Sequence, residues 1–403
     1  MTLNIERIEV LLLIAALVAM LARRLNIPYS IGLVLAGLAL AFVPFAPNIE
    51  LTRELLFTAF LPPLIFEAAI QIRWRDLRKD LLLILIFATV GVILSASVTA
   101  AGMHYAAQWS WIGAIMFGIL IAATDPVSVI AMLKHAGISG RLRLMIEAES
   151  LFNDGTAAVA FAIASAVIAG QQATALGVAK TLVQIFAGSI VCGALVGSAT
   201  VLLAGATTDH LVEITFTTIA AFGSFLLAEH FHLSGILSTL TTGLLVGNVG
   251  QLSLSRKGRA VVEDFWEYAA FVANSLIFIL IGMHLAHRNY SFVWLGALIA
   301  IAVVLAGRAV AIYPLSLLFT RSRRRLPLNQ QHILFWGGLR GALALALALA
   351  IPVGLPERES VITVAFAVVA FSIVVQGMTV RPLIRWVGKG ASDQPQKSSR
   401  DFD

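Results

Sequence analysis

Charge is scarce in this sequence, and cysteine is almost absent. Only 12% of the 403 residues are charged and 59% are hydrophobic, whereas a soluble protein carries roughly 25% charged residues. A soluble fold cannot bury that much apolar surface, so soluble and disordered classes are excluded and a membrane protein is predicted. The single cysteine, Cys192, excludes an intrachain disulfide. The net charge of +6 then indicates basic loops against an acidic membrane face, and we expect lipid, not nucleic acid, as the partner.

Several functional motifs are also missing. The sequence has no Walker A motif, which argues against ATP-driven transport, and its eight histidines form no HExxH or other metal-ligand spacing. It has no repeated filter loop such as TVGYG, which argues against a cation channel. No motif in the sequence therefore predicts an enzyme or a resident cofactor.

Long apolar runs fill most of the chain. A spanning helix needs about 20 apolar residues. On this basis we predict an all-α polytopic membrane protein with about 13 transmembrane helices, at residues 6–24, 28–46, 53–71, 80–102, 110–133, 145–169, 176–204, 210–230, 233–249, 260–285, 291–320, 330–351 and 360–386.

The basic residues predict an orientation. Placing the N-terminus outside puts 21 Lys and Arg residues on the inner side and four on the outer side. This asymmetry predicts a multi-pass protein of the cell (inner or plasma) membrane with a cytoplasmic C-terminus. The polar stretch 389–403 is predicted to be a short, disordered cytoplasmic tail.

Two predicted spans contain helix-breaking residues near their middle. The fifth reads AATDPVSVIAML, with Asp125 beside Pro126, and the twelfth reads FWGGLRGALALAL, with glycines around Arg340. Broken helices in corresponding spans of two inverted-topology repeats are typical of secondary transporters with a midplane site. Asp125 can offset the positive end of a half-helix and Arg340 a negative end. The alternative is that both residues are structural compensators only.

The sixth span, MIEAESLFNDGTAAVAF, places a carboxylate, an amide and a hydroxyl at membrane depth. Ser150 and Asp154 are four residues apart and share a helix face. Asp154, Ser150 and a freed carbonyl near Thr124 are oxygen ligands suited to a monovalent cation, and the carboxylate can exchange a proton for that cation. The alternative is a hydrogen-bonded packing motif.

Two further charged side chains lie within spans. Glu67 follows Pro62 and Pro63 in the third span, either as a functional carboxylate or as a glutamate that reaches the interface. Arg308 lies deep in the eleventh span and needs a carboxylate partner, for which Glu149 is the candidate.

The motifs ATDPVSVIAML, ESLFNDGTAAVAF, LPPLIFEA and GGLRGALALAL resemble the monovalent cation:proton antiporter family, which includes the bacterial and archaeal NhaP antiporters and the animal sodium/proton exchangers. The resemblance covers about residues 8–386. It implies a six-helix ion-binding core (78–170 and 291–388) in which two broken helices cross. A scaffold and dimerisation domain (1–77 and 171–290) would form a homodimer, and the core would move against it in an elevator-like cycle.

The resemblance also implies roles for single residues. Asp154 would bind the cation and the proton, and Ser150 and Thr124 would supply further Na⁺ ligands. Asn153, beside Asp154, implies electroneutral 1:1 exchange. Glu67 would reach the ion through water.

Two ion pairs are implied as well, Glu149 with Arg308 and Asp125 with Arg340. The implied activity is exchange of Na⁺ or Li⁺ for H⁺ in pH and sodium homeostasis, with no cofactor beyond the transported ions. A K⁺/H⁺ antiporter of the same fold is the alternative. An intramembrane aspartyl protease using Asp125 and Asp154 is a third possibility, but Asp154 lies in NDGT where that class requires GxGD.

Overall fold

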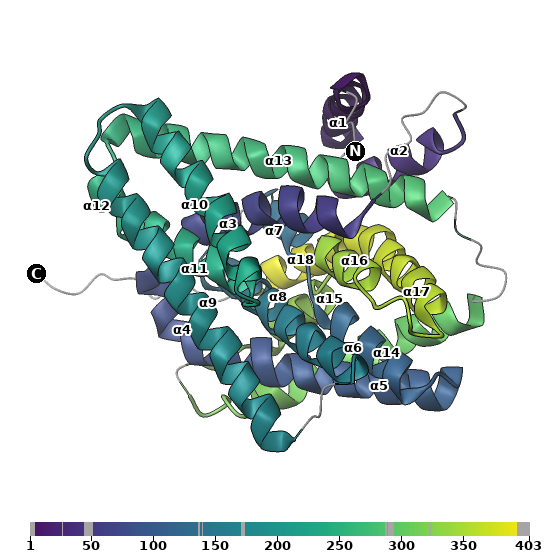
Figure 1. Ribbon diagram of the computed structural model, residues 1–403. Coiled ribbons are helices and arrows are strands. Elements are labelled where there is room, and N and C mark those ends of the chain that lie inside the picture. The colour runs from purple at the N-terminus through teal and green to yellow at the C-terminus, as the bar shows by residue number, and fades with distance from the viewer. Residues whose placement is uncertain are drawn as a thin grey trace, which may run out of the picture.

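The computed structural model is a bundle of helices (Figure 1). It describes residues 5–25, 27–43, 51–135, 138, 140–170, 174–286, 288, 294–322 and 324–392. The described helices are α1 (Ile5–Leu25), α2 (Tyr29–Leu40), the π-helical η1 (Leu55–Phe60), α3 (Leu61–Gln71), α4 (Trp74–Ile86), η2 (Phe87–Gly91), α5 (Val92–Ala107), α6 (Trp111–Ala122), α7 (Val127–His135), α8 (Arg141–Ile168), α9 (Ala175–Ala204), α10 (His210–His230), α11 (Gly235–Asn248), α12 (Gly250–Ser253), α13 (Arg256–Ala286), α14 (Trp294–Leu317), α15 (Leu328–Trp336), α16 (Ala342–Leu349), α17 (Arg358–Phe371), η3 (Ser372–Gln376) and α18 (Gly377–Ser392).

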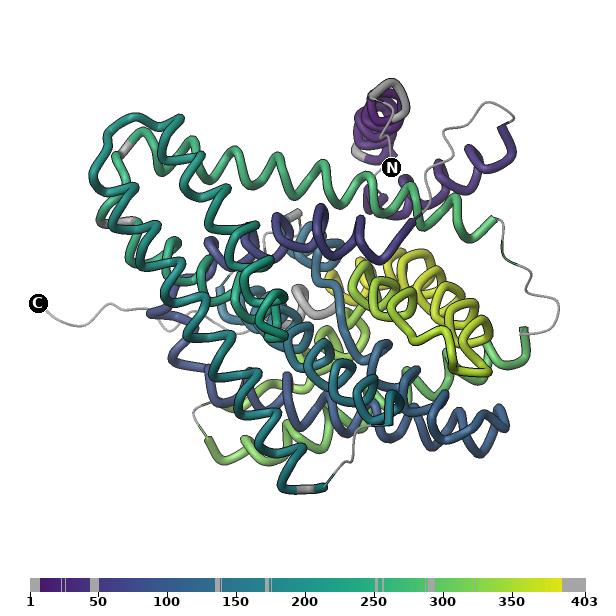
Figure 2. The backbone as a smooth tube through the Cα atoms, viewed as in Figure 1, coloured from purple at the N-terminus to yellow at the C-terminus, as the bar shows by residue number. Residues whose placement is uncertain are grey.

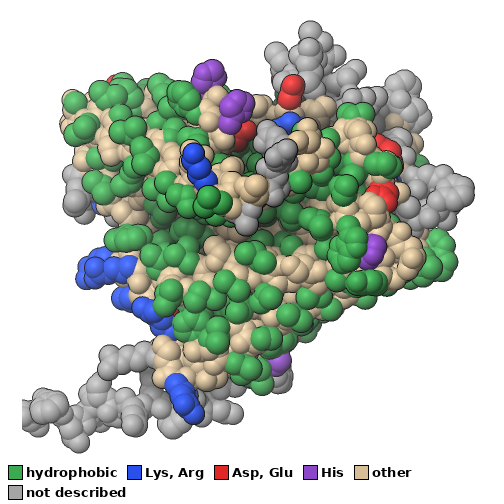
Figure 3. Space-filling model, turned by 60° about the horizontal axis from the view of Figure 1, so that its bottom comes forward, with side chains coloured by type: hydrophobic (Ala, Val, Ile, Leu, Met, Phe, Trp, Pro, Cys, Tyr) green, Lys and Arg blue, Asp and Glu red, His purple; other side chains and the backbone are tan. Residues whose placement is uncertain are grey.

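The described helices have the lengths and the surface of a multi-pass membrane protein. Seven helical segments are long and apolar enough to cross a membrane, and four shorter apolar helices accompany them. Hydrophobic side chains cover most of the face shown in Figure 3. The all-α prediction is confirmed, and a helix or a pair of helices overlaps every predicted span. Thirteen crossings remain a prediction.

Some predicted boundaries differ from the structure. The predicted span 80–102 lies within one longer helical segment, Trp74–Ala107, in which the π turn η2 joins α4 to α5. Helix α18 extends to Ser392, so the predicted disordered tail is wrong for residues 389–392. Residues 393–403 of that tail lie outside the described residues.

The helices pack in two groups. In the first, α13 lies along α2 and α3, and α11 packs between α3 and α9 (Figures 1 and 2). In the second, α5 packs against α6 and α14, α4 packs against α8, and α16 packs against α17. Helix α8 of the second group also contacts α9 and α11 of the first group. The cavity described below lies where the two groups meet.

A charged cluster ties one end of the second group together. Arg141, at the start of α8, donates to the carboxylate of Asp80 in α4 at 2.7 and 2.8 Å. The same guanidinium donates to the backbone carbonyls of Arg324 and Arg325, at 2.8 and 3.0 Å. Asp80 is buried. This network therefore holds α4, α8 and the link between α14 and α15 in one arrangement.

Candidate functional site

Two interrupted helices cross near the middle of the bundle. Helix α6 ends at Ala122 and α7 starts at Val127, and α15 ends at Trp336 before α16 starts at Ala342. The extended segments between them meet as an isolated antiparallel bridge, in which Asp125 N donates to Leu339 O at 2.7 Å. The predicted breaks in the fifth and twelfth spans are confirmed.

Proline and glycine explain where the helices break and how closely they approach. Pro126 has no backbone N–H to donate, so it does not extend α6, but it fits just before the first turn of α7. A Cβ atom on Gly341 would lie 2.7 Å from Asp125 Cγ, and one on Gly338 would lie 2.6 Å from Arg308 Nε. Gly341 therefore allows the two interrupted segments to lie this close, and Gly338 leaves room for the Arg308 side chain of α14.

The two charged residues at the breaks satisfy helix ends. Asp125 Oδ1 accepts a hydrogen bond from Val127 N at 3.0 Å, at the positive N-terminal end of α7. Arg340 Nη1 donates to the carbonyl oxygens of Ala122 and Ala123, at 2.9 and 3.2 Å, at the negative C-terminal end of α6. The expected Asp125–Arg340 ion pair is not among the ion pairs of the described residues. That expectation is corrected, because each side chain binds backbone groups freed by the break instead.

Helix α8 packs against this crossing through polar side chains. The Ser150 hydroxyl donates to the carbonyl oxygen of Thr124. Asn153 Nδ2 donates to Ala122 O at 3.2 Å and to Thr124 Oγ1 at 3.3 Å. Ser150, Thr124 and Asn153 are all buried. These bonds fix the carboxylate-bearing helix beside the free backbone of the broken one.

Glu149 and Arg308 form the buried ion pair expected between the sixth and eleventh spans. The two hydrogen bonds are 2.8 and 3.0 Å long, and the side chains are 2% and 7% exposed. Arg308 Nη2 also donates to the carbonyl oxygen of Leu334 in α15, at 3.1 Å. The pair therefore joins α8, α14 and the broken helix that contains Arg340.

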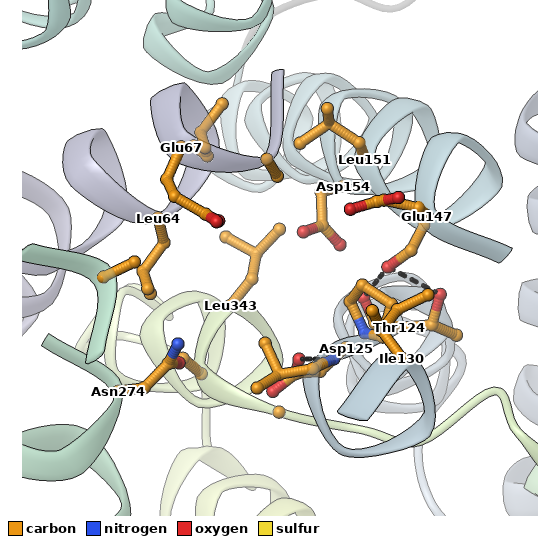
Figure 4. Close-up of a pocket in the computed structure, with 18 of the residues that line it drawn as sticks. Leu64, Glu67, Thr124, Asp125, Ile130, Glu147, Leu151, Asp154, Asn274 and Leu343 are labelled. Carbon is orange, nitrogen blue, oxygen red and sulfur yellow. Dashed lines mark hydrogen bonds between the residues drawn. The ribbon is translucent and has the colours of Figure 1, made fainter. Parts of the chain in front are cut away.

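A cavity of about 350 Å³ lies beside this crossing (Figure 4). Its lining includes five predicted site residues: Asp154, Ser150, Thr124, Asp125 and Glu67. Asp154 and Glu67 point into it from α8 and α3. Glu67 accepts a hydrogen bond from Gln71, whereas Asp154 Oδ1 is buried without a hydrogen bond from any described residue. A carboxylate oxygen left free in this way is able to take up a proton or a cation.

Asn153 does not line the cavity, although it was predicted among the ion-binding residues. Its amide nitrogen faces the end of α6, so its contacts anchor α8 to the break. Seven other polar or charged lining residues were not predicted as site residues, namely Tyr29, Gln71, Lys134, Arg143, Glu147, Glu267 and Asn274. Asn274 was recognisable in the sequence as a polar residue within the long apolar run of the tenth span.

Residues 11–386 match the family described as "Sodium/hydrogen exchanger, transmembrane", and the chain belongs to this family. The chain is 36% identical to the Na⁺/H⁺ antiporter ApNhaP of Aphanothece halophytica over 96% of this chain and 75% of that protein. It is 32% identical to the Na⁺/H⁺ antiporter NhaH of Halobacillus aidingensis over 94% of this chain and 98% of that protein.

The fold is also similar to a solved structure. The sodium proton antiporter MjNhaP1 from Methanocaldococcus jannaschii matches over 100% of both chains with a TM-score of 0.78 and 17% sequence identity. Likeness at this identity supports the fold alone.

The Glu149–Arg308 contact predicts coupled effects on stability. Glu149→Gln and Arg308→Gln each leave a buried charge unpaired, so each is expected to lose about 3–5 kcal/mol of stability, and the double variant less than the sum. Melting temperatures in detergent measure the coupling. The Arg73–Asp76 pair near the start of α4 is the control, since Asp76→Asn should leave the melting temperature close to the wild-type value. Additive losses for Glu149 and Arg308 would contradict a stabilising pair.

Proposed function

We propose that this protein is a secondary antiporter that exchanges Na⁺ or Li⁺ for H⁺ across the membrane, in pH and sodium homeostasis. The observation that carries the proposal is the free carboxylate oxygen of Asp154 in the cavity at the crossing of the broken helices. The Na⁺/H⁺ antiporters among its relatives support the same activity and the choice of Na⁺ over K⁺. No feature of the described site favours the K⁺/H⁺ alternative.

The donor set fits a monovalent cation. Asp154 supplies one negative charge, and Ser150 and Thr124 supply neutral oxygens on the neighbouring wall. Hard cations take carboxylate, hydroxyl and carbonyl oxygens as ligands. The proton and the cation compete for the carboxylate of Asp154, which therefore carries one or the other at a time. Exchange then needs no second titrating side chain at position 153.

Alternating access would require the two helix groups to move relative to each other. We propose that residues 78–170 and 291–388 form the moving core and that residues 1–77 and 171–290 form the scaffold. The Asp80–Arg141 cluster and the Glu149–Arg308 pair both join elements within this core, which supports its movement as one body. Exposed apolar side chains on the scaffold helices α9 and α10, such as Ile190 and Leu227, suit lipid contacts and the proposed homodimer.

The lining of the cavity supports a proposal about the conformational state of the protein. Its lining includes the exposed residues Gln71, Lys134 and Glu267. The positive-inside rule assigns Lys134 to the cytoplasmic side. In Figure 3 the Lys and Arg side chains gather along one edge of the face shown. We therefore propose that the N-terminus lies outside and that this is an inward-open state in a cell membrane.

Asp154→Asn is expected to abolish cation-driven proton movement, because an amide cannot take up and release the proton. The variant should keep the melting temperature of the wild-type protein or exceed it. Dequenching of a pH dye in proteoliposomes with Na⁺, Li⁺ and K⁺ added in turn measures the exchange. Asp264→Asn, at an exposed position of α13, is the control and should exchange normally. Exchange by Asp154→Asn at the wild-type rate would overturn the assignment.

Exchange is expected to be electroneutral, because only Asp154 of the Asn153–Asp154 pair can change its charge. One proton then exchanges for one monovalent cation. Recordings on a solid-supported membrane should show no sustained current, and an imposed voltage should leave the rate unchanged. A sustained Na⁺-dependent current would refute this stoichiometry.

Relative movement of core and scaffold predicts that one cross-link stops transport. The buried hydroxyls of Ser30 in α2 and Ser128 in α7 lie 2.6 Å apart and join the two proposed domains. Ser30→Cys with Ser128→Cys, in a Cys192→Ser background, brings two thiols within disulfide range. Oxidation should block exchange and a reductant should restore it.

The control cross-link lies within the scaffold. Ser224 in α10 and Thr239 in α11 have hydroxyls 3.2 Å apart. The corresponding double cysteine variant should exchange equally well when oxidised and when reduced. Unchanged exchange by the fully oxidised variant at positions 30 and 128 would show that the two groups do not need to separate.

A further inference from the structure

One face of helix α13 lines the cavity from the scaffold side. Its lining residues are Glu267, Ala270, Phe271 and Asn274, whose spacing of three and four residues places them on one side of the helix. Glu267 is exposed, whereas Asn274 is 6% exposed. At 1.5 Å per residue the two positions lie about 10 Å apart along the helix. Asn274 is therefore the deepest polar side chain that α13 contributes to the cavity.

The amide of Asn274 has no partner in the described part of the protein. More than nine-tenths of the residue is buried, and no hydrogen bond of its side chain is found there. Figure 4 shows the amide facing the cavity, on the side opposite Thr124 and Asp154. Its two amide atoms are not among the fully buried side-chain atoms without a partner, so the amide is open to the cavity that Asn274 lines. Polar groups in membrane helices that face a water-filled cavity mark ion pathways.

Most residues that follow Asn274 on α13 are apolar, and they do not line the cavity. Ile277, Phe278 and Ile281, on the next turns of α13, are buried and apolar, with exposed fractions of 0%, 1% and 0%. Asn274 thus lies where α13 stops lining the cavity and a buried apolar stretch of the helix begins. A cation that enters loses water at this depth, because fewer polar groups remain to hold its hydration shell.

We propose that Asn274 is a positioning and selectivity residue on the scaffold, whose amide oxygen replaces part of the hydration shell of the cation opposite Asp154. Hard monovalent cations accept neutral oxygen ligands of this kind. The amide does not titrate, so it assists the cation without competing for the proton. This inference rests on the proposed antiport function and adds a scaffold-side contact to the core-side site.

The assignment predicts a separable effect on cation binding. Asn274→Ala should raise the apparent KM for Na⁺ about tenfold, as expected for loss of one contact to a charged group. It should also change the ratio of the Li⁺ and Na⁺ KM values. The maximal rate at saturating Na⁺, and its pH profile, should stay close to those of the wild-type protein. Asn274→Ser keeps a smaller oxygen donor and should give an intermediate KM.

Ser275→Ala is the matched control. Ser275 is the next residue of α13, is fully buried, has a hydroxyl without a hydrogen bond from any described residue, and does not line the cavity. Exchange is measured in proteoliposomes over a range of Na⁺ and Li⁺ concentrations, and folding is checked by melting temperature. If Asn274→Ala does not fold, the Na⁺ KM and the ratio of the Li⁺ and Na⁺ KM values of Asn274→Ser test the inference instead.

Two results would overturn the inference. One is a Na⁺ KM for Asn274→Ala within about twofold of the wild-type value. The other is an equal rise for Ser275→Ala, which would assign the effect to packing of α13. If the wild-type protein moves no protons in response to Na⁺ or Li⁺, the proposed function itself fails, and this inference fails with it. Normal wild-type exchange with an unchanged Asn274→Ala variant rejects the inference alone.

Discussion

The rest of the structure depends on the backbone contact between two broken helices inside the membrane. Where Asp125 N meets Leu339 O, both chains are extended, so neighbouring N–H and C=O groups lack helical partners. No lipid can satisfy such groups, and irregular backbone at this depth is tolerated only where protein or a polar cavity surrounds it. Arg340 supplies donors to the end of α6, and Asp125 supplies an acceptor at the start of α7. Asp125 and Arg340 therefore stabilise the crossing itself, and this structural role does not depend on transport.

The same requirement shapes the ion site. A break that leaves the carbonyl of Thr124 outside a helix also leaves it within reach of Ser150 on α8. Asn153 and the Glu149–Arg308 pair fix the position of α8 against α6 and α14. In this position Asp154 faces the cavity. The packing of α8 against the break therefore places the carboxylate of Asp154 and the neutral oxygens of Ser150 and Thr124 together at the cavity. Breaking the Glu149–Arg308 pair should therefore disturb the arrangement of Asp154, Ser150 and Thr124, although neither Glu149 nor Arg308 lines the cavity.

The sequence predicted those features that single residues determine. Pro126 and the glycines around Arg340 predicted the breaks, because such residues act on the local backbone whatever surrounds them. Arg308 required a buried partner, and Glu149 was the acidic residue at the right depth. The partner of Arg340 was predicted wrongly. Family resemblance suggested a carboxylate, whereas the half-helix dipole argument had already suggested the carbonyl end that it binds.

Features that depend on three-dimensional packing were not predictable in this way. Asn274 is one polar residue in an apolar run, and only the packing of α13 beside the cavity shows that it lines the cavity. The predicted spans place Asp80 at the first position of the fourth span and Arg141 in the loop before the sixth, and nothing in the sequence shows that α4 meets the start of α8 at these residues. Asn153 was grouped with Asp154 because the two are adjacent, yet adjacent helical residues point in different directions.

The central claim is that one carboxylate, Asp154, holds either the proton or the cation. Proton release on cation binding tests it most directly. Purified protein in weakly buffered detergent solution is titrated with NaCl or LiCl while a pH dye is monitored, and choline chloride controls for ionic strength. The account predicts release of about one proton per bound cation, because the ligand must be deprotonated to bind, and no release from Asp154→Asn. Saturable cation binding without proton release would contradict the account.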